Sequence, residues 1–84
     1  MALIVQKFGG SSVADVDRVR HVAGIITDTY KAGNAVVVVL SAQGKTTDKL
    51  LAMAEQYNPR ASKRELDQLL STGEQQSVAL CAMM

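Results

Sequence analysis

At 84 residues, the chain has room for one small domain and is too short for two. Its composition is 48% hydrophobic and 20% charged, with a net charge of +1, as in an ordinary globular protein. Such a balance gives no long-range field to attract nucleic acid or an anionic membrane. The single cysteine, Cys81, excludes an internal disulfide, and we expect it to be a packing residue in a helix.

The amino terminus does not have the features of a targeting segment. MALIVQKF lacks the long apolar run and the small-residue cleavage site of a signal peptide. The longest apolar run, Ala35–Leu40, is far shorter than a membrane span. We therefore expect a cytoplasmic protein that binds neither nucleic acid nor a membrane.

The first predicted element is a strand over Leu3–Phe8, which is rich in β-branched residues and is ended by Gly9-Gly10-Ser11-Ser12. A helix should follow, with Ser12 and Asp15 in the S-x-x-D spacing of a capping box. Gly33-Asn34 predicts its end. Its apolar stripe is Val13, Val16, Val19, Ala23, Ile26 and Tyr30. Its other face is mostly charged, with Asp15, Asp17, Arg18, Arg20 and Lys31.

The next segment, Ala35–Leu40, is apolar at every position. This pattern is typical of a strand that is covered on both faces in a parallel sheet. Strand, helix and strand within about forty residues form a βαβ unit, which we expect to be right-handed. The sequence therefore predicts an α/β protein.

The polar segment Ser41–Thr46 should be a loop at the carboxyl end of the second strand. Thr46 or Thr47 is expected to cap a helix over about residues 48–57. Asn58-Pro59 predicts the end of that helix, because the residue before proline disfavours the helical conformation.

Two further capping boxes are predicted. Ser62 with Glu65 opens a helix through residue 70, and Ser71 with Glu74 opens another that runs towards Met84. The last helix has no stop signal, and only two strands are evident, whereas a parallel sheet normally has more. We therefore expect a piece of a larger domain that contains only its amino-terminal βαβαα portion.

Lys7 and the two glycines after the first strand form a candidate phosphate site. A strand that leads into Gly9-Gly10 and then into a helix supplies backbone N–H groups and a helix dipole for an anion. Glycine lets phosphate approach the main chain, and Lys7 would neutralise charge on a transferring phosphoryl group. The alternative is a simple turn in which Lys7 is a solvated charge.

The loop after the second strand is a candidate ligand site as well. Gly44-Lys45-Thr46 is not a Walker A motif, because Val39 stands where that motif needs its first glycine. Ser41, Thr46, Thr47 and Asp48 lie where open parallel sheets bind ligands, and hydroxyls there can bond to carboxylate or phosphate oxygens. The alternative for either threonine is a helix cap.

Two more residues have competing interpretations. Glu74 is either the last member of a capping box or an acidic group that pairs with the ammonium of an amino-acid substrate. His21 lies among charged helix residues and is expected on the surface. No residue is assigned as a metal ligand.

Three motifs in register resemble the aspartate kinase family of amino-acid kinases, and the resemblance covers essentially the whole chain. They are K-F-G-G-S-S-V at 7–13, S-A-Q-G followed by T-T-D within 41–48, and S-T-G-E-Q at 71–75. Ser11 stands where the family usually has threonine. Serine keeps the hydroxyl, so we expect little effect on function.

The resemblance implies an αβα sandwich around a mainly parallel sheet. It also implies transfer of the ATP γ-phosphoryl group, with Mg²⁺ on the phosphates, to the side-chain carboxylate of L-aspartate. That reaction begins lysine, threonine and methionine biosynthesis. By resemblance, Lys7 is the catalytic residue that stabilises the transition state. The implied binding residues are Lys7, Phe8, Gly9, Gly10, Ser11 and Ser41 for ATP, and Ser41, Thr47 and Glu74 for aspartate.

The family places its adenosine contacts and regulatory domains after the region matched here, so we expect that the 84-residue chain alone does not turn over ATP and aspartate. Two alternatives remain open. One is another amino-acid kinase, acting on glutamate, acetylglutamate, carbamate or a nucleotide, although the S-T-G-E-Q motif favours aspartate kinase. The other is a non-catalytic module whose sheet edges pair with a second copy or with a partner chain. The chain is thus expected to be a homo-oligomer or part of a larger chain.

Overall fold

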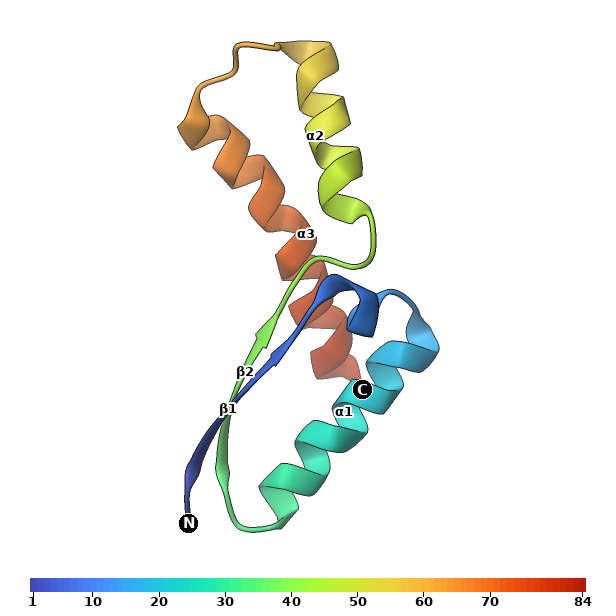
Figure 1. Cartoon of the computed structure of the whole chain (residues 1–84), viewed down its shortest axis with the longest axis vertical. Helices are drawn as coiled ribbons and strands as arrows, with labels where there is room; N and C mark the ends of the chain where they lie inside the picture. Colours follow the sequence, from blue (N-terminus) through green and yellow to red (C-terminus); the bar gives the residue numbers. More distant parts are fainter.

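The computed structural model describes residues 1–84 and shows a βαβ unit followed by two helices (Figure 1). The elements in chain order are β1 (Leu3–Phe8), the short 3-10 helix η1 (Gly10–Val13), α1 (Val16–Lys31), β2 (Ala35–Leu40), α2 (Thr46–Tyr57) and α3 (Lys63–Met83). The strands are parallel, and their register runs from Leu3 opposite Ala35 to Phe8 opposite Leu40. The predicted βαβ order and parallel sheet are confirmed.

The start of α1 differs from the prediction. Asp15 caps the helix by accepting a hydrogen bond from the amide of Arg18 (2.9 Å), whereas Ser12 lies in η1. The predicted Ser12 cap is wrong because a carboxylate stands closer to the first regular turn, where it also interacts favourably with the helix dipole. The end of α1 is confirmed, since Gly33 takes a φ of 93°, in the left-handed region that favours glycine.

The helices α2 and α3 form a hairpin that extends beyond the sheet (Figure 1). The prediction that Thr46 or Thr47 caps α2 is wrong, because Lys45 occupies the cap position and no side chain caps the helix. The amide of Thr46 is instead satisfied by the carbonyl of Gln43 (2.9 Å). Ser62 caps α3 as predicted and accepts from the amide of Glu65 (3.4 Å).

Residues 63–83 form one continuous helix, α3, where two helices were predicted. The hydroxyl of Ser71 donates to the carbonyl of Gln68 in the preceding turn (2.8 Å), so it is bonded inside a helix. The S-x-x-E spacing does not distinguish a helix start from this internal arrangement, because serine bonds equally well to the turn before it.

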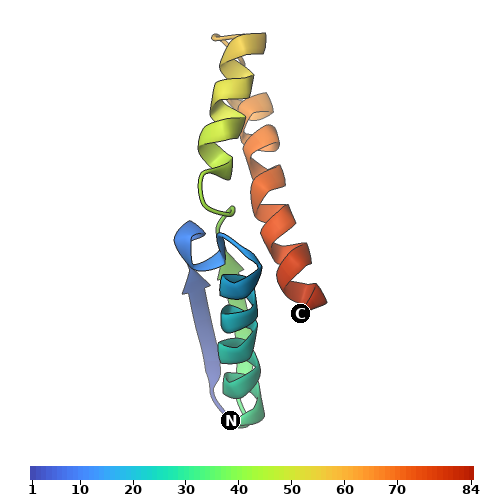
Figure 2. The same ribbon diagram turned by 90° about the vertical axis from the view of Figure 1, so that its right-hand side faces the viewer.

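The core lies between β2 and the helices α1 and α3, which pack against each other and against this strand (Figures 1 and 2). Its buried side chains are Val13, Val19, Val22 and Leu40, and Phe8, Ile26, Val38 and Cys81 pack against them. Val13 is 0% exposed, so η1 is anchored directly in the core. No helix combines the length and the apolar character needed to cross a bilayer.

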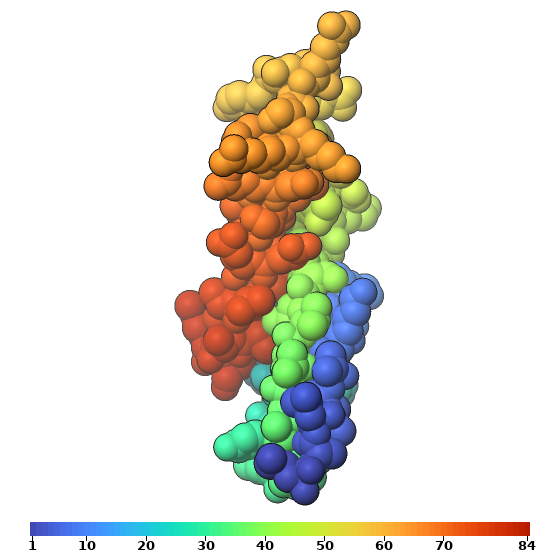
Figure 3. Space-filling view, turned by 90° about the vertical axis from the view of Figure 1, so that its left-hand side faces the viewer, coloured from blue at the N-terminus to red at the C-terminus, as the bar shows by residue number.

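The second face of the sheet is open. Figure 3 shows β1 and β2 side by side on a surface that no helix covers. Four apolar side chains on this face are 46–69% exposed, namely Leu3, Val5, Val37 and Val39. The expectation that β2 is covered on both faces is therefore wrong for this chain. The all-apolar pattern predicted a buried strand, and the residues present cover only one side of it.

Candidate functional site at the carboxyl edge of the sheet

The loops that follow β1 and β2 meet at one edge of the sheet. The amide of Ser41 donates to the carbonyl of Phe8 (3.1 Å), and the amide of Gly44 donates to the carbonyl of Gly10 (3.0 Å). Open parallel sheets bind ligands at this edge, outside the carboxyl ends of their strands. Backbone hydrogen bonds thus hold the glycine loop against the loop after β2 at the expected ligand position.

The two glycines of the first loop have different surroundings. A Cβ atom on Gly10 would lie 2.8 Å from the carbonyl oxygen of Ala42, so only glycine allows the two loops to approach this closely. Nothing lies within 4 Å of the corresponding position on Gly9. The Gly9 side of the loop therefore faces open space that a ligand can enter, whereas Gly10 serves the packing of the loops.

Lys7 is exposed and lies on the face of the sheet opposite the core. Side chains alternate along a strand, and Phe8 packs against the core, so Lys7 shares the open face with its register partner Val39. The ion pairs of the chain are Arg18 with Asp15 and Arg20 with Asp17. No carboxylate therefore neutralises the Lys7 ammonium, and its charge is available to an anion.

Ser41 and Thr47 lie on either side of the second loop. Ser41 directly follows β2, Thr47 is in the first turn of α2, and both are half-buried. The structure thus brings the glycine loop, Ser41 and the start of α2 to one edge, as the sequence predicted for a ligand site.

Glu74 is exposed on α3, within the helix and not at its start. Its neighbour Gly73 is buried, and a Cβ atom there would lie 3.0 Å from Cβ of Ala42 and 3.1 Å from Cγ2 of Thr46. The missing side chain at Gly73 lets this turn of α3 pack directly on the second loop. This packing holds the backbone of Glu74 in the turn that contacts the loop. Because that turn lies inside α3, the capping-box interpretation is wrong.

Arg18 bonds to the glycine loop, a contact that the sequence did not predict. The sequence predicted only that Arg18 lies on the polar face of a helix. Its Nη1 donates to the carbonyl of Ser11 (2.7 Å), and its Nε lies 3.7 Å from Oδ2 of Asp15. The available signal was the D-x-x-R spacing directly after the loop, which pairs the helix cap with a residue one turn later.

The residues present give a divalent cation no protein cage. No group of three or more histidine, cysteine, aspartate or glutamate side chains lies together. Within 7–12 and 41–48, Asp48 is the only acidic residue. The residues present at this edge therefore do not form a carboxylate-lined cation site.

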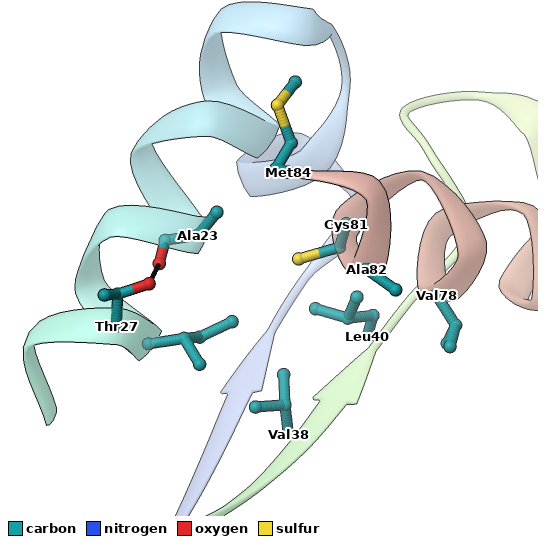
Figure 4. Close-up of a pocket in the computed structure, with 9 residues that line it drawn as sticks. Ala23, Thr27, Val38, Leu40, Val78, Cys81, Ala82 and Met84 are labelled. Carbon is teal, nitrogen blue, oxygen red and sulfur yellow. Dashed lines mark hydrogen bonds between the residues drawn. The ribbon is translucent and has the colours of Figure 1, made fainter. Parts of the chain in front are cut away.

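Cys81 and His21 lie outside this site. Burial raises the pKa of the Cys81 thiol, whose side chain points towards an open apolar cavity of about 290 Å³ between α1, β2 and α3 (Figure 4). Cys81 is thus a packing residue in a helix, as predicted. His21 is exposed on α1, also as predicted.

Comparison with known proteins identifies the family. The model of the Amino acid kinase family matches residues 2–84. Aspartokinases of Mycolicibacterium smegmatis and Geobacillus stearothermophilus are 60% and 57% identical over 83 residues, which is 99% of this chain and 20% of each relative. The crystal structure of aspartate kinase from Synechocystis superposes with a TM-score of 0.93 at 54% identity, over 96% of this chain and 14% of that chain. The chain spans about a fifth of the length of the curated relatives it matches. It belongs to the amino acid kinase family.

Proposed function

We propose that the chain forms the phosphate-binding and aspartate-binding edge of an aspartate kinase, which transfers the γ-phosphoryl group of ATP to the side-chain carboxylate of L-aspartate. One observation carries this proposal: the glycine loop is fixed against the loop between β2 and α2, with the uncompensated charge of Lys7 beside it. The names of the aspartokinase relatives support aspartate as the acceptor. We propose that this reaction takes place in the cytoplasm and that it begins lysine, threonine and methionine biosynthesis.

The residues of the first loop stabilise charge on the phosphates. An oxygen of the aspartate carboxylate attacks the γ-phosphorus, the bond from that phosphorus to the bridging oxygen breaks, and ADP leaves. Lys7 neutralises the negative charge on the transferring group, and the open backbone at Gly9 donates its N–H to a phosphate oxygen. Mg²⁺ bound on the phosphates supplies further charge neutralisation. No covalent enzyme intermediate is needed, because positioning and charge stabilisation carry this chemistry.

The residues after β2 and on α3 position the acceptor. Ser41 lies between the two loops, at the junction of phosphate and aspartate, and Thr47 offers a hydroxyl to the aspartate. Glu74 pairs with the aspartate ammonium, since no basic residue of the chain forms an ion pair with it. An acidic group at this position favours an amino acid over a simple dicarboxylate.

A chimera tests the proposal. In it, this chain replaces the matching segment of the Geobacillus stearothermophilus aspartokinase, to which it is 57% identical. Hydroxylamine traps an acyl phosphate as a hydroxamate, so the product can be assayed directly with a panel of acceptors. We expect ATP-dependent hydroxamate from aspartate and none above background from glutamate or acetylglutamate. A chimera that folds and prefers another carboxylate would contradict the proposed acceptor.

The open sheet face favours a second candidate, a self-associating module. Leu3, Val5, Val37 and Val39 form an exposed apolar surface beside unpaired strand edges, which commonly drive association. Mass-resolved size measurement of the purified chain tests this candidate. A monomer with a sharp unfolding transition would count against it.

A further inference from the structure

Four consecutive carbonyl groups, from Phe8 to Ser11, are all occupied by donors within the chain. The Phe8 carbonyl accepts from the amide of Ser41 (3.1 Å), and the Gly9 carbonyl accepts from the amide of Ser12 (3.0 Å). The Gly10 carbonyl accepts from the amide of Gly44 (3.0 Å), and the Ser11 carbonyl accepts from Nη1 of Arg18 (2.7 Å). An exposed polar loop has no need to satisfy every carbonyl internally, because water is available to it. The arrangement therefore fixes the direction of each peptide in the loop.

This arrangement suits an anion. A carbonyl oxygen carries partial negative charge and repels phosphate, whereas an amide N–H attracts it. With the four oxygens turned towards internal donors, the loop can present amides to a ligand. The amide of Gly9 donates to no group in the chain, and the space beside Gly9 is open.

Arg18 is the only side chain among the four donors. Asp15 caps α1 through the amide of Arg18 (2.9 Å) and lies 3.7 Å from its guanidinium, so the direction of the arginine is set by the helix start. The peptide between Ser11 and Ser12 is held at both ends, its oxygen by Arg18 and its N–H by the carbonyl of Gly9.

We propose that Arg18 is a positioning residue for phosphate binding: it holds the Ser11 carbonyl away from the ligand and so keeps the loop in its anion-accepting form. This inference rests on the proposed function. Arg18 acts through the loop and need not touch the phosphates. Removing its guanidinium frees the Ser11–Ser12 peptide to turn, which presents an oxygen to the phosphate and lowers affinity.

The chain contains a matched control. Arg20 lies on the same helix and pairs with Asp17 (3.1 Å) at the same i, i+3 spacing, but it forms no hydrogen bond with the loop. The arginine side chains are 57% exposed for Arg18 and 66% exposed for Arg20. Arg18→Met and Arg20→Met therefore remove the same group from similar surroundings. Arg18→Lys retains a donor and should restore part of the effect.

Amide NMR on the ¹⁵N-labelled 84-residue chain tests the proposal in two ways. The ¹H–¹⁵N NOE reports the order of residues 9–13 without ligand, and titration with ATP reports affinity. We expect Arg18→Met to lower the NOE at Ser11 and Ser12 and to raise the apparent Kd for ATP about three- to tenfold, the effect of losing one hydrogen bond of ordinary net strength at a solvent-exposed site. Arg20→Met should change neither quantity.

The outcomes separate the two proposals. Equal loop order and equal ATP affinity in Arg18→Met and wild type would overturn the role of Arg18, as would an identical change in Arg20→Met. If the wild-type chain shows no shift at Gly9 or Gly10 with ATP, the proposed phosphate site is contradicted. The NOE comparison still decides in that case whether Arg18 holds the loop.

Discussion

Replacing Gly10 by alanine should destabilise the chain by forcing the two loops apart. The added methyl group would lie 2.8 Å from the oxygen of Ala42, and 3.4 and 3.5 Å from the backbone oxygen and nitrogen of Gly44. These neighbours are main-chain atoms, so a side-chain rotation cannot relieve the contact. Overpacking of this kind costs about 1–3 kcal/mol. Loss of the hydrogen bond from Gly44 to Gly10 would add about 1 kcal/mol.

That cost is large for this chain. A domain of this size is stable by about 4–12 kcal/mol at roughly 0.05–0.15 kcal/mol per residue. Since 7 of the 84 residues are buried, we expect a value near the lower end. A loss of about 2 kcal/mol lowers the Tm by about 8–16 °C in a domain of this length. Thermal unfolding followed by far-UV circular dichroism measures the shift.

Two other glycines serve as controls. Nothing lies within 4 Å of a Cβ on Gly9 or Gly24, and φ of Gly9 is −75°, which any residue can adopt. Gly9→Ala should therefore leave the Tm unchanged. Gly24→Ala, inside α1, should gain about 0.5–1 kcal/mol. If Gly10→Ala unfolds at the wild-type temperature, or if Gly9→Ala is destabilised as much, the close approach of the loops is not what requires glycine.

Two further variants test the helix cap and the buried thiol. Asp15→Ala removes the α1 cap and should lower the free energy of unfolding, measured with denaturant, by about 1 kcal/mol. The Asp17 side chain is 91% exposed, so Asp17→Ala should lower it much less. Equal losses would contradict the assigned cap. Burial raises the folded-state pKa of Cys81, so stability from the neutral thiol is fully present below the ordinary pKa of 9.0 and is lost as pH rises through the folded value. The Tm should consequently fall more steeply above about pH 9 in the wild type than in Cys81→Ala, and parallel curves would exclude the thiol as the cause.

The order of elements could be predicted because local patterns specify it. The β-branched segment Leu3–Phe8 and the helix stop at Gly33 lie where they were predicted. The apolar stripe of α1 was predicted only in part: Val19 is buried as expected, but Val16 and Tyr30 are 61% and 69% exposed, and the buried Val22 was not in the predicted stripe. The serine and threonine caps were harder to predict. Ser62 begins a helix and Ser71 lies inside one, although both have the same S-x-x-E spacing. Local sequence cannot separate them, because the difference lies in whether the preceding turn is already helical.

The position of the site could be predicted from the sequence, but the contacts within it could not. Its position at the carboxyl edge follows from two parallel strands, so Lys7 and Ser41 could be expected there. The different roles of Gly9 and Gly10 depend on where Ala42 comes to lie, which is a tertiary contact. The hydrogen bond from Arg18 to Ser11 likewise depends on the angle between η1 and α1, which the sequence pattern does not encode.

The most direct test of the central claim is the kcat of the chimera with Lys7→Ala, compared with Lys31→Ala. Lys31 lies in the last turn of α1, which leads into the amino end of β2 at the edge of the sheet opposite the ligand edge, so its removal tests only the loss of one lysine (Figure 1). We predict that Lys7→Ala lowers kcat for aspartate-dependent ADP release by about 100-fold or more, as for loss of a transition-state charge partner, and that Lys31→Ala leaves it unchanged. A Lys7→Ala chimera that is folded and as active as the Lys31→Ala control would contradict the assignment of this edge as the phosphoryl-transfer site.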